Sequence, residues 1–307
     1  MTLEFRREPT KGTVIVIANE RSNRPMVFKG AHVTCPFDKG VESLTPPTKL
    51  ALPTRKNWRV RAFDNAFAFL KPRGKYKPPR NGGEWVSPAY GEHEVIVESD
   101  DHAKLFQEFD SEQLALIFKA YVTRLSAIGR RRGIEYAYLF KNHGLKGGAS
   151  IEHEHSQAVG LPFVPPVIAA EAEANRKAGC CIHCKMLKTE KPRMLAENAF
   201  FTAFCPQASR MPFETWIVAK RHVGHMAGFT DAEAKAFMEM LRYCIDRVYR
   251  ISHDYNVFFH NSPGKGKLHF HAEICPRSNV WAGMELGAGV IINGKTADEA
   301  LAALKAV

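Results

Sequence analysis

A glycine-rich segment followed by alternating histidines constrains this chain more than any other feature. Residues 142–150 read NHGLKGGAS, and residues 151–157 read IEHEHSQ. In an extended strand, side chains two positions apart share one face, so His153, His155 and Gln157 are expected to project together. They would project beside a loop whose backbone amides can hold phosphate. A neutral imidazole in that setting can attack phosphorus and carry a nucleotidyl group.

Two alternating histidines can also be ordinary half-exposed strand residues. Three features favour the catalytic interpretation: the glycine-rich approach, the glutamine at position 157 and a second histidine pair at His269 and His271. The two pairs differ at the next position of the alternation, which is Gln157 in the first and Glu273 in the second. The carboxylate of Glu273 would repel an incoming phosphate. We therefore assign catalysis to the first half of the chain.

The order of elements around these pairs occurs twice, which indicates an internal duplication. Each half has a strand ending near a histidine, a capped helix, another strand and then the alternating histidines. Asp110 and Thr230 are the expected helix caps. The proline-rich residues 161–166 mark the connection, and a helix is expected over residues 167–177. We predict an α+β fold of two tandem units, each with an antiparallel sheet and a packed helix.

The run NHGLKGGASIEHEHSQ resembles the active-site segment of the galactose-1-phosphate uridylyltransferase family, a branch of the histidine-triad superfamily. The runs IANERSNRP, FDNAFAFL, GEHEVIVESDDH and AGMELGAGVIIN resemble other segments of that family, in family order over nearly the whole chain. The resemblance implies two tandem histidine-triad-like units. Residues 1–165 would be the catalytic half, and residues 166–307 would carry a zinc site and a sugar-site tail.

We expect His155 to be the nucleophile of a ping-pong nucleotidyl transfer. Ser150 and the amides around Gly147 and Gly148 would stabilise charge on the nonbridging phosphate oxygens. Gln157 would add a neutral hydrogen bond there. Histidine-triad hydrolases have a third histidine at this place, which can move a proton to a poor leaving group, whereas glutamine cannot. Gln157 therefore favours a transferase or phosphorylase over a hydrolase.

The remaining substrate-binding predictions come mainly from the resemblance. Arg21 and Arg24 match family positions near the nucleotide phosphates, although they can also be surface arginines. Asn65 and Phe67 would border the nucleobase or ribose, and Phe67 can alternatively be a core aromatic. The predicted substrate site also includes Asn142.

The glycine-rich tail over residues 281–293 is too rich in glycine for a core helix and too apolar for a free linker. In the family, the matching segment contributes to the sugar-phosphate site, and active sites form between the subunits of a dimer. We therefore expect a homodimer in which Glu285 accepts hydrogen bonds from sugar hydroxyls. An ordinary surface loop is the alternative.

Cysteines and histidines in the second half have the spacing of a zinc site. Two thiolates of a CxxC pair and two imidazoles make a closed tetrahedral shell, which is structural. The predicted ligands are Cys181, Cys184, His222 and His269, with His225 or His183 as alternatives to His222.

A corresponding set in the first half departs from the family pattern. Relatives have CPFC where this chain has Cys35 and Asp38. Carboxylate oxygen can ligate zinc, but it weakens selectivity for zinc over harder ions. The predicted ligands are Cys35, Asp38, His102 and His153, and without a metal the two histidines would join strand ends by hydrogen bonds.

Composition limits the class of protein and its surroundings. The chain has 307 residues, a net charge of +11 and seven cysteines, whose odd number and clustering favour metal binding over a disulfide framework. No apolar run approaches the roughly 18 residues of a membrane span, and the N-terminus lacks a signal-peptide core, so we expect a cytoplasmic protein. The basic runs at residues 71–80 and 130–132 lack interleaved aromatic residues. They are expected to be solvated surface, and a nucleic-acid partner is not expected.

Three functions are compatible with these features. The first is UDP-glucose:hexose-1-phosphate (galactose-1-phosphate) uridylyltransferase of galactose metabolism, which takes a nucleotide sugar and a sugar 1-phosphate. The second is a nucleotide-sugar phosphorylase similar to ADP-glucose phosphorylase, with inorganic phosphate as acceptor. The third is a noncatalytic, zinc-stabilised nucleic-acid-binding protein, which intact His155 and Gln157 argue against.

Overall fold

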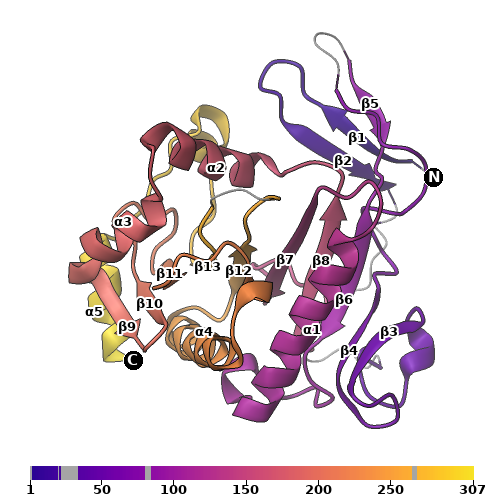
Figure 1. The fold of residues 1–307 in the computed structure, drawn as a ribbon, viewed down its shortest axis with the longest axis horizontal. Helices are drawn as coiled ribbons and strands as arrows, with labels where there is room; N and C mark the ends of the chain where they lie inside the picture. Colours follow the sequence, from indigo (N-terminus) through magenta and orange to yellow (C-terminus); the bar gives the residue numbers. More distant parts are fainter. Residues whose placement is uncertain (1, 20, 22–33, 80–83, 265–267) are drawn as a thin grey trace.

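One ten-stranded antiparallel sheet organises the computed structural model, which describes residues 2–19, 21, 34–79, 84–264 and 268–307 (Figure 1). From one edge to the other, its strands are β3 (Thr48–Pro53), β4 (Trp58–Asp64), β6 (Glu92–Val97), β8 (His155–Leu161), β7 (Tyr136–His143), β12 (Tyr255–His260), β13 (His271–Pro276), β11 (Thr215–Ala219), β10 (Phe201–Phe204) and β9 (Met194–Glu197).

The strand order confirms the predicted duplication. Outward from the central β7–β12 pair, each half places its histidine-bearing strand next, followed by three further strands in matching order. Phe140 of β7 pairs with Phe258 of β12, and within each half these two residues pair with Gln157 and Glu273. Register therefore makes Gln157 and Glu273 equivalent positions. The α+β fold of two tandem units is confirmed, while the division after residue 165, between β8 and α2, stays a prediction.

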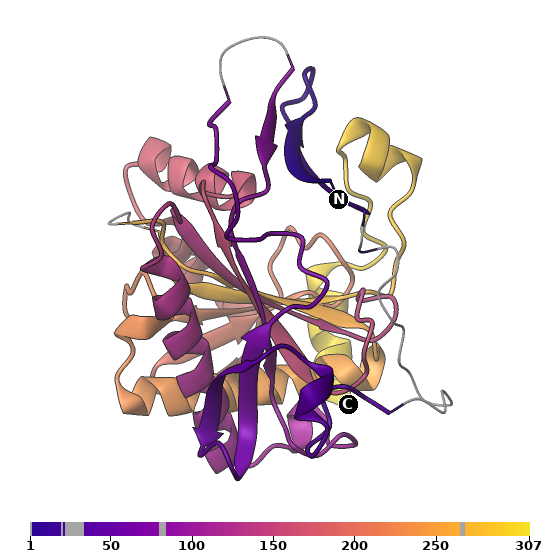
Figure 2. The same ribbon diagram turned by 90° about the vertical axis from the view of Figure 1, so that its right-hand side faces the viewer.

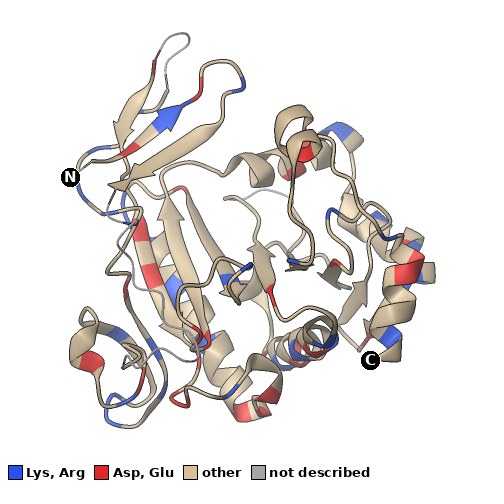
Figure 3. Cartoon of the chain, turned by 180° about the vertical axis from the view of Figure 1, so that it is seen from behind, with Lys and Arg blue, Asp and Glu red and all other residues tan. Residues whose placement is uncertain are grey.

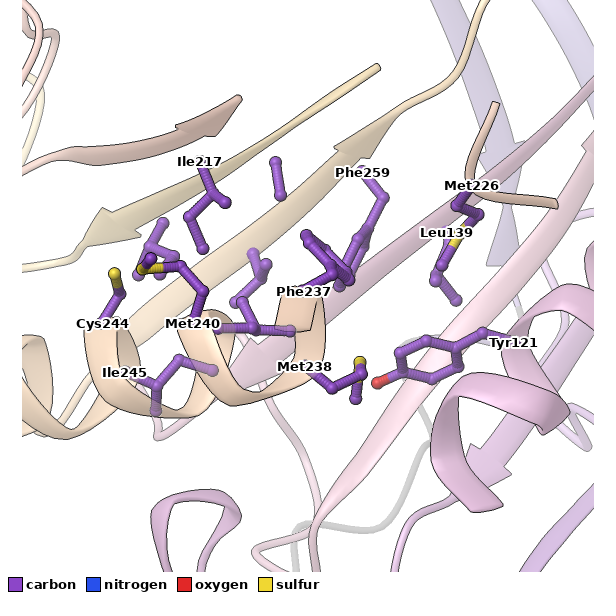
Figure 4. Packing of buried hydrophobic residues seen from close by; sticks show 14 of the residues in the cluster. Tyr121, Leu139, Ile217, Met226, Phe237, Met238, Met240, Cys244, Ile245 and Phe259 are labelled. Carbon is purple, nitrogen blue, oxygen red and sulfur yellow. The ribbon is translucent and has the colours of Figure 1, made fainter. Parts of the chain in front are cut away.

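Two long helices cover one face of this sheet. They are α1 (Ser111–Gly129) and α4 (Asp231–Ile251), and they contact each other. Both begin where the sequence predicted, because Asp110 and Thr230 accept the backbone N–H three residues later. Figure 4 shows residues of both halves packed in one cluster, among them Tyr121 and Leu139 with Phe237 and Phe259. The two units thus share a hydrophobic core.

The other helices lie mainly in the second half and include α2, which the sequence predicted over residues 167–177. The α-helices are α2 (Pro166–Ala178), α3 (Ile182–Thr189) and α5 (Ala297–Ala306). Short helical turns are η2 (Glu42–Leu44), η3 (Phe106–Glu108), η4 (Lys191–Arg193), η5 (Met226–Gly228) and η6 (Met284–Ala288). The α3 helix was not predicted: the Cys181 sulfur accepts the Cys184 N–H and so caps this helix.

A small sheet at one end of the molecule comes from the N-terminal part of the chain (Figures 1 and 2). Its strands run in the order β2 (Val14–Ala18), β1 (Leu3–Arg7) and β5 (Val86–Pro88). Phe5 is fully buried there in a cluster that includes Trp85 and Val159 of β8. This packing attaches the small sheet to the strand that carries His155.

The charged surface agrees with the expected solvated segments. Residues 130–132 are exposed, and most of residues 71–79 are exposed or half-buried. Figure 3 shows basic and acidic residues interspersed along many elements. Among the helices of the described residues, none has both the length and the apolar character needed to cross a membrane.

Candidate active site and candidate metal centres

A cavity of about 290 Å³ opens beside the start of β8. Seven of the predicted residues line it: Arg21, Asn65, Phe67, Gly148, Ser150, His155 and Gln157. Gly148 has a φ of +82°, a conformation that favours glycine, and its Cβ position is open. The predicted glycine-rich loop thus borders the predicted nucleophile.

His155 has the geometry of a nucleophile. Its Nδ1 lies 2.8 Å from the His153 carbonyl oxygen. A carbonyl only accepts, so Nδ1 carries the proton and donates, which leaves a lone pair on Nε2. Burial lowers the pKa of His155 to about 4, so the ring is neutral at pH 7.

Gln157 is held by two neighbours at its carbonyl end. His93 Nε2 lies 2.8 Å from Gln157 Oε1, and Asn65 Nδ2 lies 3.4 Å from the same oxygen. His93 was not among the residues predicted from the sequence. Nothing in its local pattern distinguishes it from other polar residues of a strand, and its contact with Gln157 spans 64 positions of the sequence.

Arg21 is placed at the cavity by its neighbours. Its Nη1 donates to the Phe67 carbonyl at 2.9 Å, and its guanidinium lies over the Phe69 ring at 5.1 Å. Phe67 is half-buried and faces the cavity. Arg24 lies outside the described residues.

Three predicted binding residues do not line this cavity. Asn142 Oδ1 accepts a bond from Asn256 Nδ2 at 2.8 Å. A Cβ on Gly147 would come within 2.1 Å of the His143 carbonyl oxygen, so this position needs glycine for packing. Glu285, on η6, accepts the N–H groups of Ala282 and Ile292 within its own segment.

The predicted second-half metal ligands converge. Cys184 Sγ lies 3.3 Å from His269 Nδ1 and 3.5 Å from His222 Nδ1, and Cys181 Sγ lies 3.6 Å from His269 Nδ1. Tetrahedral zinc, with bonds of about 2.0–2.3 Å, places its ligand atoms about 3.3–3.8 Å apart. These four side chains therefore fit zinc. The alternative His225 instead accepts the Ala227 N–H and caps η5.

The first-half set also converges, with a carboxylate in place of the second thiolate. Asp38 Oδ1 lies 2.8 Å from His102 Nδ1 and 3.1 Å from His153 Nδ1, and Cys35 Sγ lies 3.9 Å from His153 Nδ1. His153 Nε2 donates to the Ser99 carbonyl at 2.8 Å, so its Nδ1 is directed to this cluster. The donor set fits a divalent cation, and its oxygen ligand makes it harder than the second-half set.

The second-half counterpart of the candidate active-site cavity is filled by protein side chains. His183 and Trp216 pack against His271, with ring centroids 4.0 and 5.4 Å away. Glu171, His260 and Glu273 also converge on His271. This cluster was not predicted from the sequence, because α2 brings Glu171 to strands about 90 positions later in the chain.

Known proteins resemble this chain over nearly its full length. The family described as galactose-1-phosphate uridyl transferase, N-terminal domain, matches residues 3–165. An ADP-glucose phosphorylase of Arabidopsis thaliana is 28% identical, covering 94% of this chain and 89% of the relative. A galactose-1-phosphate uridylyltransferase of Thermotoga maritima is 27% identical, covering 99% of this chain and 98% of the relative.

Solved structures agree with these relatives. The crystal structure of the Arabidopsis thaliana ADP-glucose phosphorylase with bound ADP-glucose has a TM-score of 0.80 at 25% identity, covering 99% of this chain and 98% of that chain. A uridylyltransferase mutant has a TM-score of 0.82 at 26% identity, with the same coverage. With its alternating histidines and its duplicated sheet, the chain belongs to the galactose-1-phosphate uridyl transferase family.

Proposed function

We propose that this enzyme transfers a nucleotide from a nucleotide sugar through a covalent adduct of His155, and that it is a UDP-glucose:hexose-1-phosphate uridylyltransferase. Family membership supports the reaction class. The observation that carries the proposal is the neutral ring of His155, whose Nε2 is unprotonated beside a cavity bordered by Gly148 and Ser150.

In the first half-reaction, His155 Nε2 attacks the α-phosphorus of the nucleotide sugar. The Nε2–P bond forms, the P–O bond to the β-phosphate breaks, and sugar 1-phosphate leaves. The Nδ1 proton stays on the ring, donated to the His153 carbonyl. In the second half-reaction, a phosphate oxygen of the acceptor attacks the same phosphorus, and the Nε2–P bond breaks.

The neighbours of His155 suit transfer between phosphates. Ser150, the amide of Gly148 and the amide of Gln157 can donate hydrogen bonds to the nonbridging oxygens. None of these groups is a general acid, and phosphate leaving groups need none. Zinc, if bound by either four-residue cluster, would brace strand ends and take no part in bond making.

A nucleotide-sugar phosphorylase is the second candidate, with inorganic phosphate as acceptor. It is favoured by the similarity to the Arabidopsis thaliana ADP-glucose phosphorylase over 94% of the chain. The two candidates share the first half-reaction in chemistry and differ in nucleobase and acceptor.

One experiment tests both. The protein is incubated with UDP-glucose or ADP-glucose without acceptor, and its intact mass is measured. A nucleotidyl adduct on the wild type and none on His155→Ala is expected, and the added mass identifies the nucleotide. The isolated adduct is then chased with galactose 1-phosphate or inorganic phosphate to identify the acceptor. Absence of an adduct with every nucleotide sugar would refute the proposal.

The same proposal includes a cytoplasmic homodimer whose partner subunit brings Glu285 to the hexose. All seven cysteines are unpaired, which suits a reducing compartment. Around Glu285, apolar side chains are exposed, among them Met284, Leu286 and Ile292. Exposed apolar patches favour protein contacts. Light scattering tests the dimer. Glu285→Ala should weaken use of sugar 1-phosphate while the His155 adduct still forms.

A further inference from the structure

His93 is buried behind the candidate active site, and neither the proposed chemistry nor the metal clusters use it. It lies on β6, opposite Val159 of β8, and only 2% of the residue is exposed. Its ring packs on Phe69 with centroids 4.3 Å apart. A buried imidazole with defined partners can fix the direction of a hydrogen-bond chain.

The backbone fixes that direction here. The Phe69 N–H donates to His93 Nδ1 at 3.3 Å. A backbone N–H can only donate, so Nδ1 is an acceptor, and the proton of the neutral ring is on Nε2. Burial also lowers the pKa of His93 to about 3, so the ring is neutral throughout the physiological range.

The next donor in this chain of hydrogen bonds is His93 Nε2, which lies 2.8 Å from Gln157 Oε1. Asn65 supports the same arrangement. Its Oδ1 accepts the Phe67 N–H at 2.8 Å, which turns its Nδ2 toward Gln157 Oε1 at 3.4 Å. Asn65 Nδ2 also lies 3.1 Å from His93 Nε2, as expected for two donors that share one acceptor oxygen. The carbonyl end of Gln157 therefore faces two donors, and its NH₂ end remains for the cavity that Gln157 lines.

We propose that His93 is a positioning residue that fixes the amide of Gln157, so that its NH₂ group and not its carbonyl meets the phosphate of the bound nucleotide. With the amide reversed, two electron-rich oxygens would face each other and the transition state would lose a donor. This inference rests on the proposed function, because it assigns the orientation of a group in that same site.

The second half supports the assignment by contrast. By register, the position of His93 corresponds to Glu214: each stands two residues before the partner of Gln157 or Glu273. Glu214 accepts from Arg210, and Arg210 also pairs with Glu273. In each half, the residue at this position therefore helps to hold the side chain that follows the histidine pair: His93 holds Gln157 directly, and Glu214 holds Glu273 through Arg210. Only the first half fixes a neutral amide, with a donor left over.

The test is single-turnover nucleotidylation with the nucleotide sugar that labels the wild type, without acceptor. In His93→Leu we expect the rate constant to fall about 100-fold, the typical effect of losing one transition-state donor. The endpoint should stay at one adduct per chain, and affinity for the nucleotide sugar should change far less than the rate. His93→Gln, which keeps a donor near the Nε2 position, should recover most of the rate. Glu214→Gln is the matched control and should react like the wild type.

Several outcomes overturn the inference. A wild-type rate in His93→Leu removes the role, and so does equal loss in the Leu and Gln variants. A low endpoint in His93→Leu would assign His93 to folding alone. ¹⁵N NMR of the His93 imidazole gives an answer that does not depend on turnover. A proton found on Nδ1 would contradict the proposed chain of hydrogen bonds from Phe69 through His93 to Gln157. If the wild type forms no adduct, the proposed function fails, and the NMR result still decides the orientation.

Discussion

His155 and His271 occupy equivalent positions in the two halves but have opposite electrostatic environments. Burial lowers the pKa of His155 to about 4. Burial alone would also lower the pKa of His271, but the hydrogen bond and charge of Glu273, with Glu171, outweigh burial and raise it. The first ring is neutral and lies beside a cavity, whereas the second packs against His183 and lies near the carboxylates of Glu171 and Glu273. The paired strands place the two histidines at equivalent positions, and the neighbouring side chains determine the pKa of each ring.

The halves also differ beneath these strands, on the face that α1 and α4 cover. In the first half, Lys141 is buried and pairs with Glu98 at 2.6 Å and with Glu154. Lys141 Nζ also lies 3.3 Å from the His155 carbonyl oxygen, and Glu98 accepts from Tyr121 and Ser156. The equivalent second-half positions, from register and helix position, are all apolar and buried: Phe259, Ala219, Phe270, Leu241 and Ala272.

This contrast shows that the same arrangement of strands and helix can pack without charged residues at these five positions. The second half packs the same strands and helix with hydrocarbon at all five positions. Buried ion pairs add little net stability compared with well-packed apolar residues. We therefore infer that the cluster serves mainly to position the strand that carries His155, which Lys141 contacts, and adds little to the stability of the fold.

The largest expected effect is the difference between alanine substitutions at His155 and at His271, the equivalent positions of the two halves. His155→Ala should abolish adduct formation, lowering its rate by at least about 1,000-fold, because the substitution removes the proposed nucleophile. His271→Ala should form the adduct at nearly the wild-type rate. Intact mass during single turnover measures both, with circular dichroism as the folding control. Loss of the adduct in His271→Ala alone would reverse the assignment of the halves.

The second prediction concerns the buried cluster. Lys141→Met leaves Glu98 and Glu154 without their cation and should reduce the free energy of unfolding by about 3–5 kcal/mol. Replacing all five polar residues by their second-half counterparts should recover much of that stability. Urea unfolding followed by circular dichroism measures both variants. If the fivefold variant is less stable than Lys141→Met, the two halves are not interchangeable in packing.

The third prediction compares the metal clusters. Cys181→Ser with Cys184→Ser should remove about one zinc per chain and lower the thermal midpoint, because a zinc ion held by these ligands would join α3 to the strand ends. Asp38→Cys should give the first half two thiolates and tighten its zinc binding against a chelator. Metal analysis of protein prepared without chelator provides the baseline. A wild type with no zinc would refute the second-half ligand assignment.

The smallest expected effect is on the pH profile. In the proposed reaction the neutral form of His155 is the nucleophile, and the fraction of this form falls only as the pH drops through about 4. The nucleotidylation rate should therefore be flat from about pH 8 to about pH 5 and decline below that. NMR titration should find that His271 gains its proton at higher pH than His155. Glu273→Gln should lower the pKa of His271 and leave that of His155 unchanged.

Local periodicity accounts for what could be predicted. A period of two placed His153, His155 and Gln157 on one face, and all three lie in clusters that the structure forms. The capping residues predicted where α1 and α4 begin, because a cap depends only on neighbours within three positions. Strands such as β9 and β10 were missed because their short runs carry little periodic signal. The CxxC pair was predicted, but the helix it caps was not.

By itself, the sequence determined the alternation of the histidines, the duplication and the two ligand sets, because each is a pattern of residue types along the chain. Only the tertiary structure decided that His93 holds Gln157, that Lys141 lies under His155 and that Arg210 neutralises Glu273. These contacts join residues 14 to 64 positions apart. Most depend on which strands pair and in which register. A buried polar group is stable only where a partner from another segment satisfies it, and that partner exists only once the sheet has formed.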